Sequence, residues 1–275
     1  MSKGVVHSRF SVCQNILANE SMADDLDIVR SAGLGAIALM APNVMSTGVD
    51  ETVRMLRERS LVVSSYLAGV PVLMLDSDRA DEALRDCITK AHHLDTHVAV
   101  VGTGSLAGRT TAEADEHMIA CLRRIRGFAA DHDVQLALEP LHPLMHSHSY
   151  LHSLAHAAEL VSEGTGAGIA LDLVHTYWNR DLNRALEDFA SLVCSVHLGD
   201  LDQVALDEKR WERAPLGSGV VPVAELLRPL AQRGFSGYFE YEVPSPADRD
   251  ESIANLSDAQ AWLEGIWDRD LSNGP

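Results

Sequence analysis

Four segments in the second half of the chain decide the fold: VQLALEPLH at residues 134–142, GIALDLVH at 168–175, VCSVHLGD at 193–200 and SGYFEYE at 236–242. Each is a short run of aliphatic, β-branched or aromatic residues, and each reaches a carboxylate or an imidazole near its end. Runs of this kind are typical of buried strands in a parallel sheet. Amphipathic stretches lie between them, so the pattern indicates repeated strand–helix units.

The same alternation extends back to the N-terminus. We predict eight strands, near residues 9–13, 35–40, 61–68, 97–102, 134–139, 168–173, 193–198 and 236–242. Helical patterns follow near residues 21–32, 48–59, 77–94, 111–131, 152–163, 182–190, 221–233 and 251–267. Eight such units in 275 residues predict an α/β protein with one (β/α)8 TIM-barrel domain over residues 1–275. An open doubly wound sheet remains compatible, because the sequence does not show strand order.

Composition excludes several classes of partner. The 22 Lys and Arg residues against 40 Asp and Glu residues give a formal net charge of −18, which repels nucleic acid and anionic membrane surfaces. No apolar run of 18 residues is present, and the first 15 residues hold too short an apolar core for a secretory signal. Four widely spaced cysteines fit neither a disulfide framework nor a zinc knuckle. We therefore expect a cytoplasmic protein with a small-molecule substrate and neither nucleic acid nor membrane as a partner.

The ends of the last four predicted strands supply candidate metal ligands. Functional side chains of TIM barrels lie at the C-terminal ends of the strands. Glu139, Asp172, His197 and Glu240 stand near those ends and would converge on the barrel axis. A single carboxylate there is more often a helix cap, but four donors at similar depth predict one divalent ion. Three carboxylates and one imidazole favour Mn²⁺, with Mg²⁺, Co²⁺ or Zn²⁺ also possible.

These four residues, together with His175 and with Arg213 in the segment ERAPLGSG, carry a family resemblance. The chain resembles the xylose-isomerase-like TIM-barrel superfamily, and most of all its branch of ketose 3-epimerases, inosose-modifying enzymes and hydroxypyruvate isomerase. The resemblance implies that the four residues bind the metal and that His175 and Arg213 contact substrate oxygens. Barrels of this family often associate, so a homo-oligomer is possible, although the sequence shows no interface signal of its own.

The expected chemistry follows from such a site. A divalent ion that chelates a carbonyl and the adjacent hydroxyl acidifies the intervening C–H bond and stabilises a cis-enediolate. Glu139 and Glu240 would then act as the acid/base pair, returning the proton to the other face or to the neighbouring carbon. We predict a metal-dependent isomerase or epimerase of a keto-sugar, sugar phosphate or related polyol. The alternatives are a lyase that uses the same site, either a dehydratase or a glycoside-eliminating enzyme, and a barrel without catalysis.

Several loop residues are candidates for substrate contact. His142 lies close behind Glu139, and Trp178 follows His175 closely enough to stack on a sugar ring. Gly217-Ser-Gly219 could cradle a phosphate, but we favour an ordinary turn. Gly102-Thr-Gly-Ser-Leu-Ala107 satisfies only a loose dinucleotide pattern, because it follows the fourth strand and lacks the later acidic residue.

Overall fold

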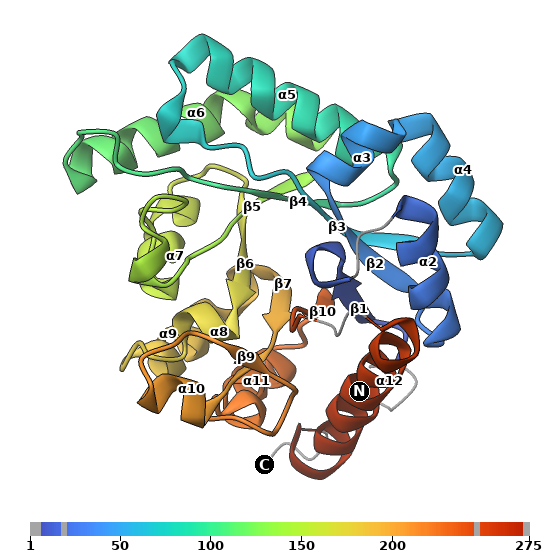
Figure 1. The fold of residues 1–275 in the computed structure, drawn as a ribbon. Coiled ribbons are helices and arrows are strands. Elements are labelled where there is room, and N and C mark those ends of the chain that lie inside the picture. The colour runs from blue at the N-terminus through green and yellow to red at the C-terminus, as the bar shows by residue number, and fades with distance from the viewer. Residues whose placement is uncertain (1–6, 18–20, 245–247, 272–275) are drawn as a thin grey trace.

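The computed structural model describes residues 7–17, 21–244 and 248–271, so residues 1–6 of the N-terminal segment lie outside it. Within these residues, eight parallel strands close into a barrel (Figure 1). In spatial order the strands are β1 (Phe10–Cys13), β10 (Tyr238–Tyr241), β7 (Val193–Leu198), β6 (Gly168–Asp172), β5 (Gln135–Leu138), β4 (Val98–Val101), β3 (Val62–Leu67) and β2 (Ala36–Met40). Because β1 pairs with both β10 and β2, the predicted (β/α)8 barrel is confirmed and an open sheet is excluded.

Helices surround the barrel (Figure 1). The main ones are α2 (Met22–Ser31), α4 (Val49–Arg59), α5 (Ser77–His93), α6 (Thr111–Asp131), α7 (Leu154–Ser162), α9 (Leu182–Phe189), α11 (Val223–Gln232) and α12 (Arg249–Ile266). Each matches a predicted helix within two residues at either end. Polar caps fix several helix starts: Thr110 and Glu113, for example, form a reciprocal capping box at α6.

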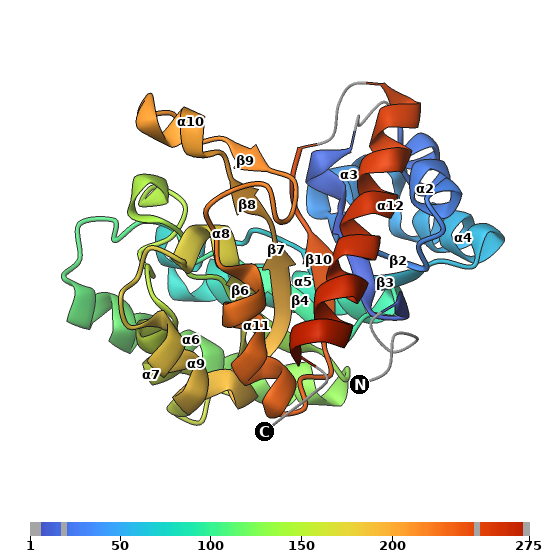
Figure 2. The ribbon, with the colours of Figure 1, turned by 90° about the horizontal axis from the view of Figure 1, so that it is seen from below.

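Short elements that the sequence did not predict lie in the connecting loops. They include the helices α3 (Ala41–Thr47), α8 (Leu173–Thr176) and α10 (Gln203–Asp207), and the hairpin of β8 (Asp200–Leu201) and β9 (Arg213–Ala214). Single turns are η1 (Gln14–Ile16), η2 (Val72–Met74), η3 (Pro143–Met145), η4 (Ala190–Leu192) and η5 (Trp267–Leu271). In Figure 2 the β8–β9 hairpin and α10 rise beyond the end of β7.

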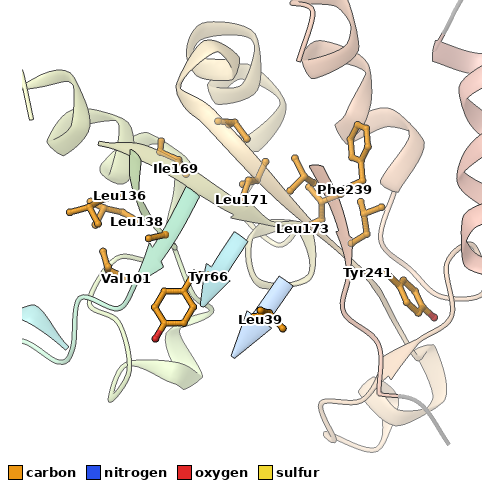
Figure 3. Close-up of a cluster of buried hydrophobic side chains, with 14 of the residues drawn as sticks. Leu39, Tyr66, Val101, Leu136, Leu138, Ile169, Leu171, Leu173, Phe239 and Tyr241 are labelled. Atoms are coloured by element: carbon orange, nitrogen blue, oxygen red, sulfur yellow. The ribbon is translucent and has the colours of Figure 1, made fainter. Parts of the chain in front are cut away.

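The buried apolar side chains divide into two groups. The larger group fills the layer between strands and helices, and Figure 3 shows part of it, including Leu138, Ile169 and Phe239. The smaller group comprises Val100, Ala137 and Ala170, with partly buried side chains packed against it. Alternate residues of a strand face opposite sides of the sheet. Polar strand residues that face the barrel axis, as this smaller group does, therefore place charge inside the barrel.

No helix in the described part of the chain is long and apolar enough to cross a membrane. All four cysteines are free thiols, as their wide spacing in the sequence suggests.

Phe239 offers a test of the outer layer at the barrel closure. It is buried, pairs in register with Phe10 of β1, and lies 5.2 Å from the ring of Trp267. Phe239→Ala should lower the free energy of unfolding by about 3–5 kcal/mol, since it leaves a cavity. Phe239→Leu, which keeps most of the apolar volume, should cost clearly less. Urea unfolding followed by circular dichroism measures both, and equal losses would contradict this packing.

Candidate metal centre

Four side chains converge at the C-terminal ends of the strands. Glu139 follows β5, Asp172 ends β6, His197 lies in β7 and Glu242 follows β10, and one donor atom of each lies within 4.8 Å of the others. Nδ1 of His197 lies 2.8 Å from Oε1 of Glu139 and 3.5 Å from Oε2 of Glu242. The structure thus brings together three of the four residues that the sequence nominated.

Glu240, the fourth nominated residue, is not part of this group. It lies opposite His197 of β7 and Ser11 of β1 in the strand register and is fully buried. Its Oε2 approaches the other ring nitrogen of His197, Nε2, at 3.1 Å. Glu242 faces the same side of the strand two residues on, about 6.6 Å nearer the mouth by the usual rise per residue. In the structure Glu242, rather than Glu240, thus shares the group with Glu139, Asp172 and His197, while metal ligation by the predicted set stays a prediction.

The electrostatics of the group fit a divalent cation. Both ring nitrogens of His197 are buried beside carboxylates, yet neither makes a well-directed hydrogen bond. Burial lowers the pKa of His197, but Glu139 and Glu240 more than offset this and raise it well above its usual value. The pKa of Glu242 lies above its usual value. Burial is the largest cause, and the charges of Asp172 and Glu139 raise it further, while Arg213 and His197 act in the opposite direction. Crowded carboxylates around an imidazole nitrogen are a hard, oxygen-rich donor set.

Arg213 contacts two of these carboxylates. Its Nη2 donates to Oδ2 of Asp172 at 2.7 Å and lies 3.3 Å from Oε2 of Glu242. Burial raises the pKa of Asp172, but Arg213 and the nearby histidines outweigh it and hold that pKa well below its usual value. In the structure Arg213 therefore pairs with two candidate ligands, and its predicted contact with substrate stays a prediction. Its Nη1 is buried without a hydrogen-bond partner.

Asp200 holds the loop that carries Arg213, a role that the sequence analysis missed. Its Oδ2 accepts hydrogen bonds from the backbone N–H groups of Gly217 and Gly219, and its Oδ1 from those of Leu201 and Val221. A side chain at Gly219 would meet the Leu201 carbonyl oxygen at 2.2 Å, so only glycine fits there. The amides of the Gly-Ser-Gly turn are therefore engaged by the protein's own carboxylate.

Aromatic rings and histidines form one wall of the mouth. His175 stacks on Trp211 with ring centroids 6.0 Å apart, and His142 lies 4.4 Å from Trp211 and 5.4 Å from Trp178. The backbone N–H of His175 donates to Oδ1 of Asp172, which ties this wall to the candidate ligands. The structure thus brings together His142, His175 and Trp178, as predicted for substrate contact, and Trp178 is 41% exposed.

Asn15 is a second residue that the sequence analysis missed. It lies in η1, directly after β1, and its Nδ2 donates to Oε1 of Glu242 at 2.6 Å. The signal was present in the sequence, because Asn15 is a polar residue just beyond the end of the first predicted strand.

The segment with the loose dinucleotide pattern, by contrast, has a structural role. The hydroxyls of Thr103 and Ser149 form a hydrogen bond, and the N–H of Gly104 donates to the backbone carbonyl oxygen of His148.

The anchoring role of Asp200 can be measured. Asp200→Ala removes the acceptor of four backbone N–H groups and should lower the free energy of unfolding by about 2 kcal/mol or more. The same loop offers a matched control in Asp202→Ala, which removes one cap bond from the Ala205 N–H and should cost about 1 kcal/mol. Urea unfolding gives both costs, and protease sensitivity between residues 202 and 220 should rise in Asp200→Ala alone. Equal behaviour of the two variants would refute the anchor.

Comparisons with known proteins agree with this geometry. The family model described as xylose isomerase-like TIM barrel matches residues 26–266. A comparison with curated protein sequences finds no match. Among solved structures, the IolI protein with a bound zinc atom is 16% identical, with a TM-score of 0.79 over 96% of this chain and 100% of that chain.

Two further structures resemble the chain over nearly its whole length. D-psicose 3-epimerase with D-tagatose, from Clostridium cellulolyticum H10, is 13% identical with a TM-score of 0.77, over 94% of this chain and 99% of that chain. The probable 3-DHS dehydratase AsbF from Bacillus anthracis is 17% identical with a TM-score of 0.71, over 90% and 97%. At these identities the structures establish the shared barrel, and the family model covers most of the chain. The chain therefore belongs to the xylose isomerase-like TIM-barrel family.

Proposed function

We propose that this protein is a divalent-metal-dependent enzyme that isomerises or epimerises a keto-sugar or related polyol. One observation carries the proposal: Glu139 and Glu242, which follow strands separated in the barrel by β6 and β7, face the same nitrogen of His197 and remain partly accessible. Their side chains are 21% and 16% exposed, whereas that of Glu240 is 0% exposed. A carboxylate must be within reach of the substrate to move its proton, so we replace Glu240 with Glu242 in the acid/base pair.

Glu139, Asp172, His197 and Glu242 would hold the ion. When bound, a divalent ion polarises a carbonyl and its neighbouring hydroxyl and so acidifies the C–H bond between them. Each glutamate has two oxygens, so one oxygen can bind while the other handles a proton. One of Glu139 and Glu242 removes the proton, and the other returns one to the opposite face, giving the epimer. Return to the neighbouring carbon gives the isomer.

Mn²⁺ is the ion we propose first, because three carboxylates and one imidazole form a mostly oxygen site. Mg²⁺ and Co²⁺ suit the same donors. Zn²⁺ is the ion in the IolI structure, whose barrel is similar. The measurement below therefore includes each of them.

The mouth favours an unphosphorylated substrate. The Gly-Ser-Gly turn is the feature of the sequence that suggested phosphate binding, and the cationic side chain of Arg213 is a second group that could pair with an anion. The turn amides are occupied by Asp200, and Nη2 of Arg213 by Asp172. The exposed face of Trp178 offers instead an apolar surface on which the C–H face of a sugar can stack.

Metal binding tests the assigned ligands. Asp172→Asn and Glu242→Gln should each weaken binding by more than the roughly 10–100-fold typical of a residue that only supports a ligand. Glu208→Gln, whose side chain is 59% exposed on the loop, is the control and should bind as the unchanged protein does. Titration calorimetry with Mn²⁺, Mg²⁺, Co²⁺ and Zn²⁺ gives the affinities. A protein that binds none of these ions would be the barrel without catalysis.

The reaction itself can be followed in D₂O with the Mn²⁺-loaded protein and a panel of keto-sugars and inososes. We expect an epimer or isomer that carries solvent deuterium at the reacting carbon, and no loss of mass. Glu139→Gln and Glu242→Gln should each lower the rate by about 100-fold or more, since each removes a proton-transfer group. An unsaturated product with loss of water or an alcohol would instead establish the lyase. We retain that alternative because one of the similar structures is a probable dehydratase.

A further inference from the structure

We infer that Glu240 is a positioning residue: from inside the barrel it holds Nε2 of His197, so that Nδ1 of the same ring faces Glu139, Asp172 and Glu242. The inference rests on the proposed metal site, and it assigns a role to Glu240, a charged residue that is not among the proposed ligands. Glu240 is fully buried in the barrel interior, where no substrate reaches it.

The contacts of His197 have two sides. Nε2 lies 3.1 Å from Oε2 of Glu240, while Nδ1 lies 2.8 Å from Oε1 of Glu139. A neutral imidazole carries one N–H, and the group beside one nitrogen decides which nitrogen keeps its lone pair. With a cation among the carboxylates at Nδ1, the ring would keep its one proton on Nε2, where the carboxylate of Glu240 can accept a hydrogen bond. The contact is at hydrogen-bonding distance without full alignment, and such contacts tighten when a ligand completes the site.

The barrel interior is built to hold Glu240 in place. Oγ of Ser65 donates to Oε2 of Glu240 at 3.0 Å, and beside it Ser11 and Ser64 bond to each other at 2.7 Å. The strand register sets Ser11 and His197 on either side of Glu240. Burying a carboxylate costs free energy unless it is paired and hydrogen-bonded. Small serine side chains leave room for the carboxylate, and one of them bonds to it.

The arrangement differs from a second ligand set. Cys13, His197 and Glu240 also bring donor atoms within 4.8 Å of one another. If these residues held their own ion, His197 would bridge two ions, and the protein would bind two ions per chain. The positioning role requires one.

Calorimetric titration of the folded variants with Mn²⁺ tests the inference. Glu240→Ala should bind Mn²⁺ about 10–100-fold more weakly, the usual effect of losing a group that orients a metal-bound histidine. Glu240→Gln keeps an oxygen that can accept a hydrogen bond from the Nε2–H group and should recover most of the affinity. Ser65→Ala, which frees Glu240 from its hydrogen bond, should lie between the unchanged protein and Glu240→Ala.

Ser195→Ala is the matched control. Ser195 faces the same interior two residues before His197, is buried, and its hydroxyl makes no hydrogen bond, so its loss should leave the affinity unchanged. The visible absorption of Co²⁺ in the same proteins reports the geometry of the ligands, and it should change in Glu240→Ala but not in Ser195→Ala. If Glu240→Ala does not fold, Ser65→Ala and Glu240→Gln carry the comparison.

Three outcomes would overturn the inference. Glu240→Ala or Ser65→Ala with unchanged affinity and spectrum would show that Glu240 does not orient the ring. Glu240→Gln as weak as Glu242→Gln would make Glu240 a ligand, and two ions per chain would establish the second ligand set. If the unchanged protein binds no ion, the proposed function fails instead, so the two failures are distinguishable.

Discussion

Repulsion among crowded carboxylates is the constraint on which the mouth of this barrel depends. Glu139, Asp172 and Glu242 are held close together around one imidazole nitrogen. Arg213 compensates part of this charge through Asp172 and Glu242. Like charges at such separations interact by several kcal/mol at the effective dielectric of a protein surface, so the group keeps its shape only because rigid strands carry it. The same crowding makes a divalent cation its natural counterion.

The loops at the mouth hold the groups that contact these carboxylates in fixed positions. The hairpin of β8 and β9 delivers Arg213, and Asp200 fixes the base of the hairpin through backbone amides. Asn15 reaches Glu242 from η1, directly after the first strand, so segments from the two halves of the chain meet at one carboxylate. Residues far apart in sequence are in this way held in the geometry of the proposed metal site.

The barrel was predictable because hydrophobic periodicity is local. Each main helix and strand could be read from spacing and composition, and closure followed from their number and the chain length. Glu139, Asp172 and His197 could also be identified from the sequence, since each is the one ionisable side chain at the end of its strand. Glu240 and Glu242 show the limit: both lie on the same face of β10 or its extension, and only the side-chain positions show that Glu242 joins Glu139, Asp172 and His197. The sequence analysis missed Asp200 and Asn15 for another reason: their partners lie in loops whose conformation the sequence pattern does not determine.

The Gly-Ser-Gly turn around Asp200 has a consequence for how such a barrel can diversify. Backbone amides that elsewhere bind an external anion here bind one that the chain supplies itself, so the base of the loop folds without any ligand. The tip, residues 203–212, is joined to the barrel through this base, the short β8–β9 pairing and the packing of Trp211 against His142 and His175. Apart from Trp211, length and composition of the tip can therefore vary without moving Arg213, because the base of the loop sets the place of Arg213 and of the charges that it contacts.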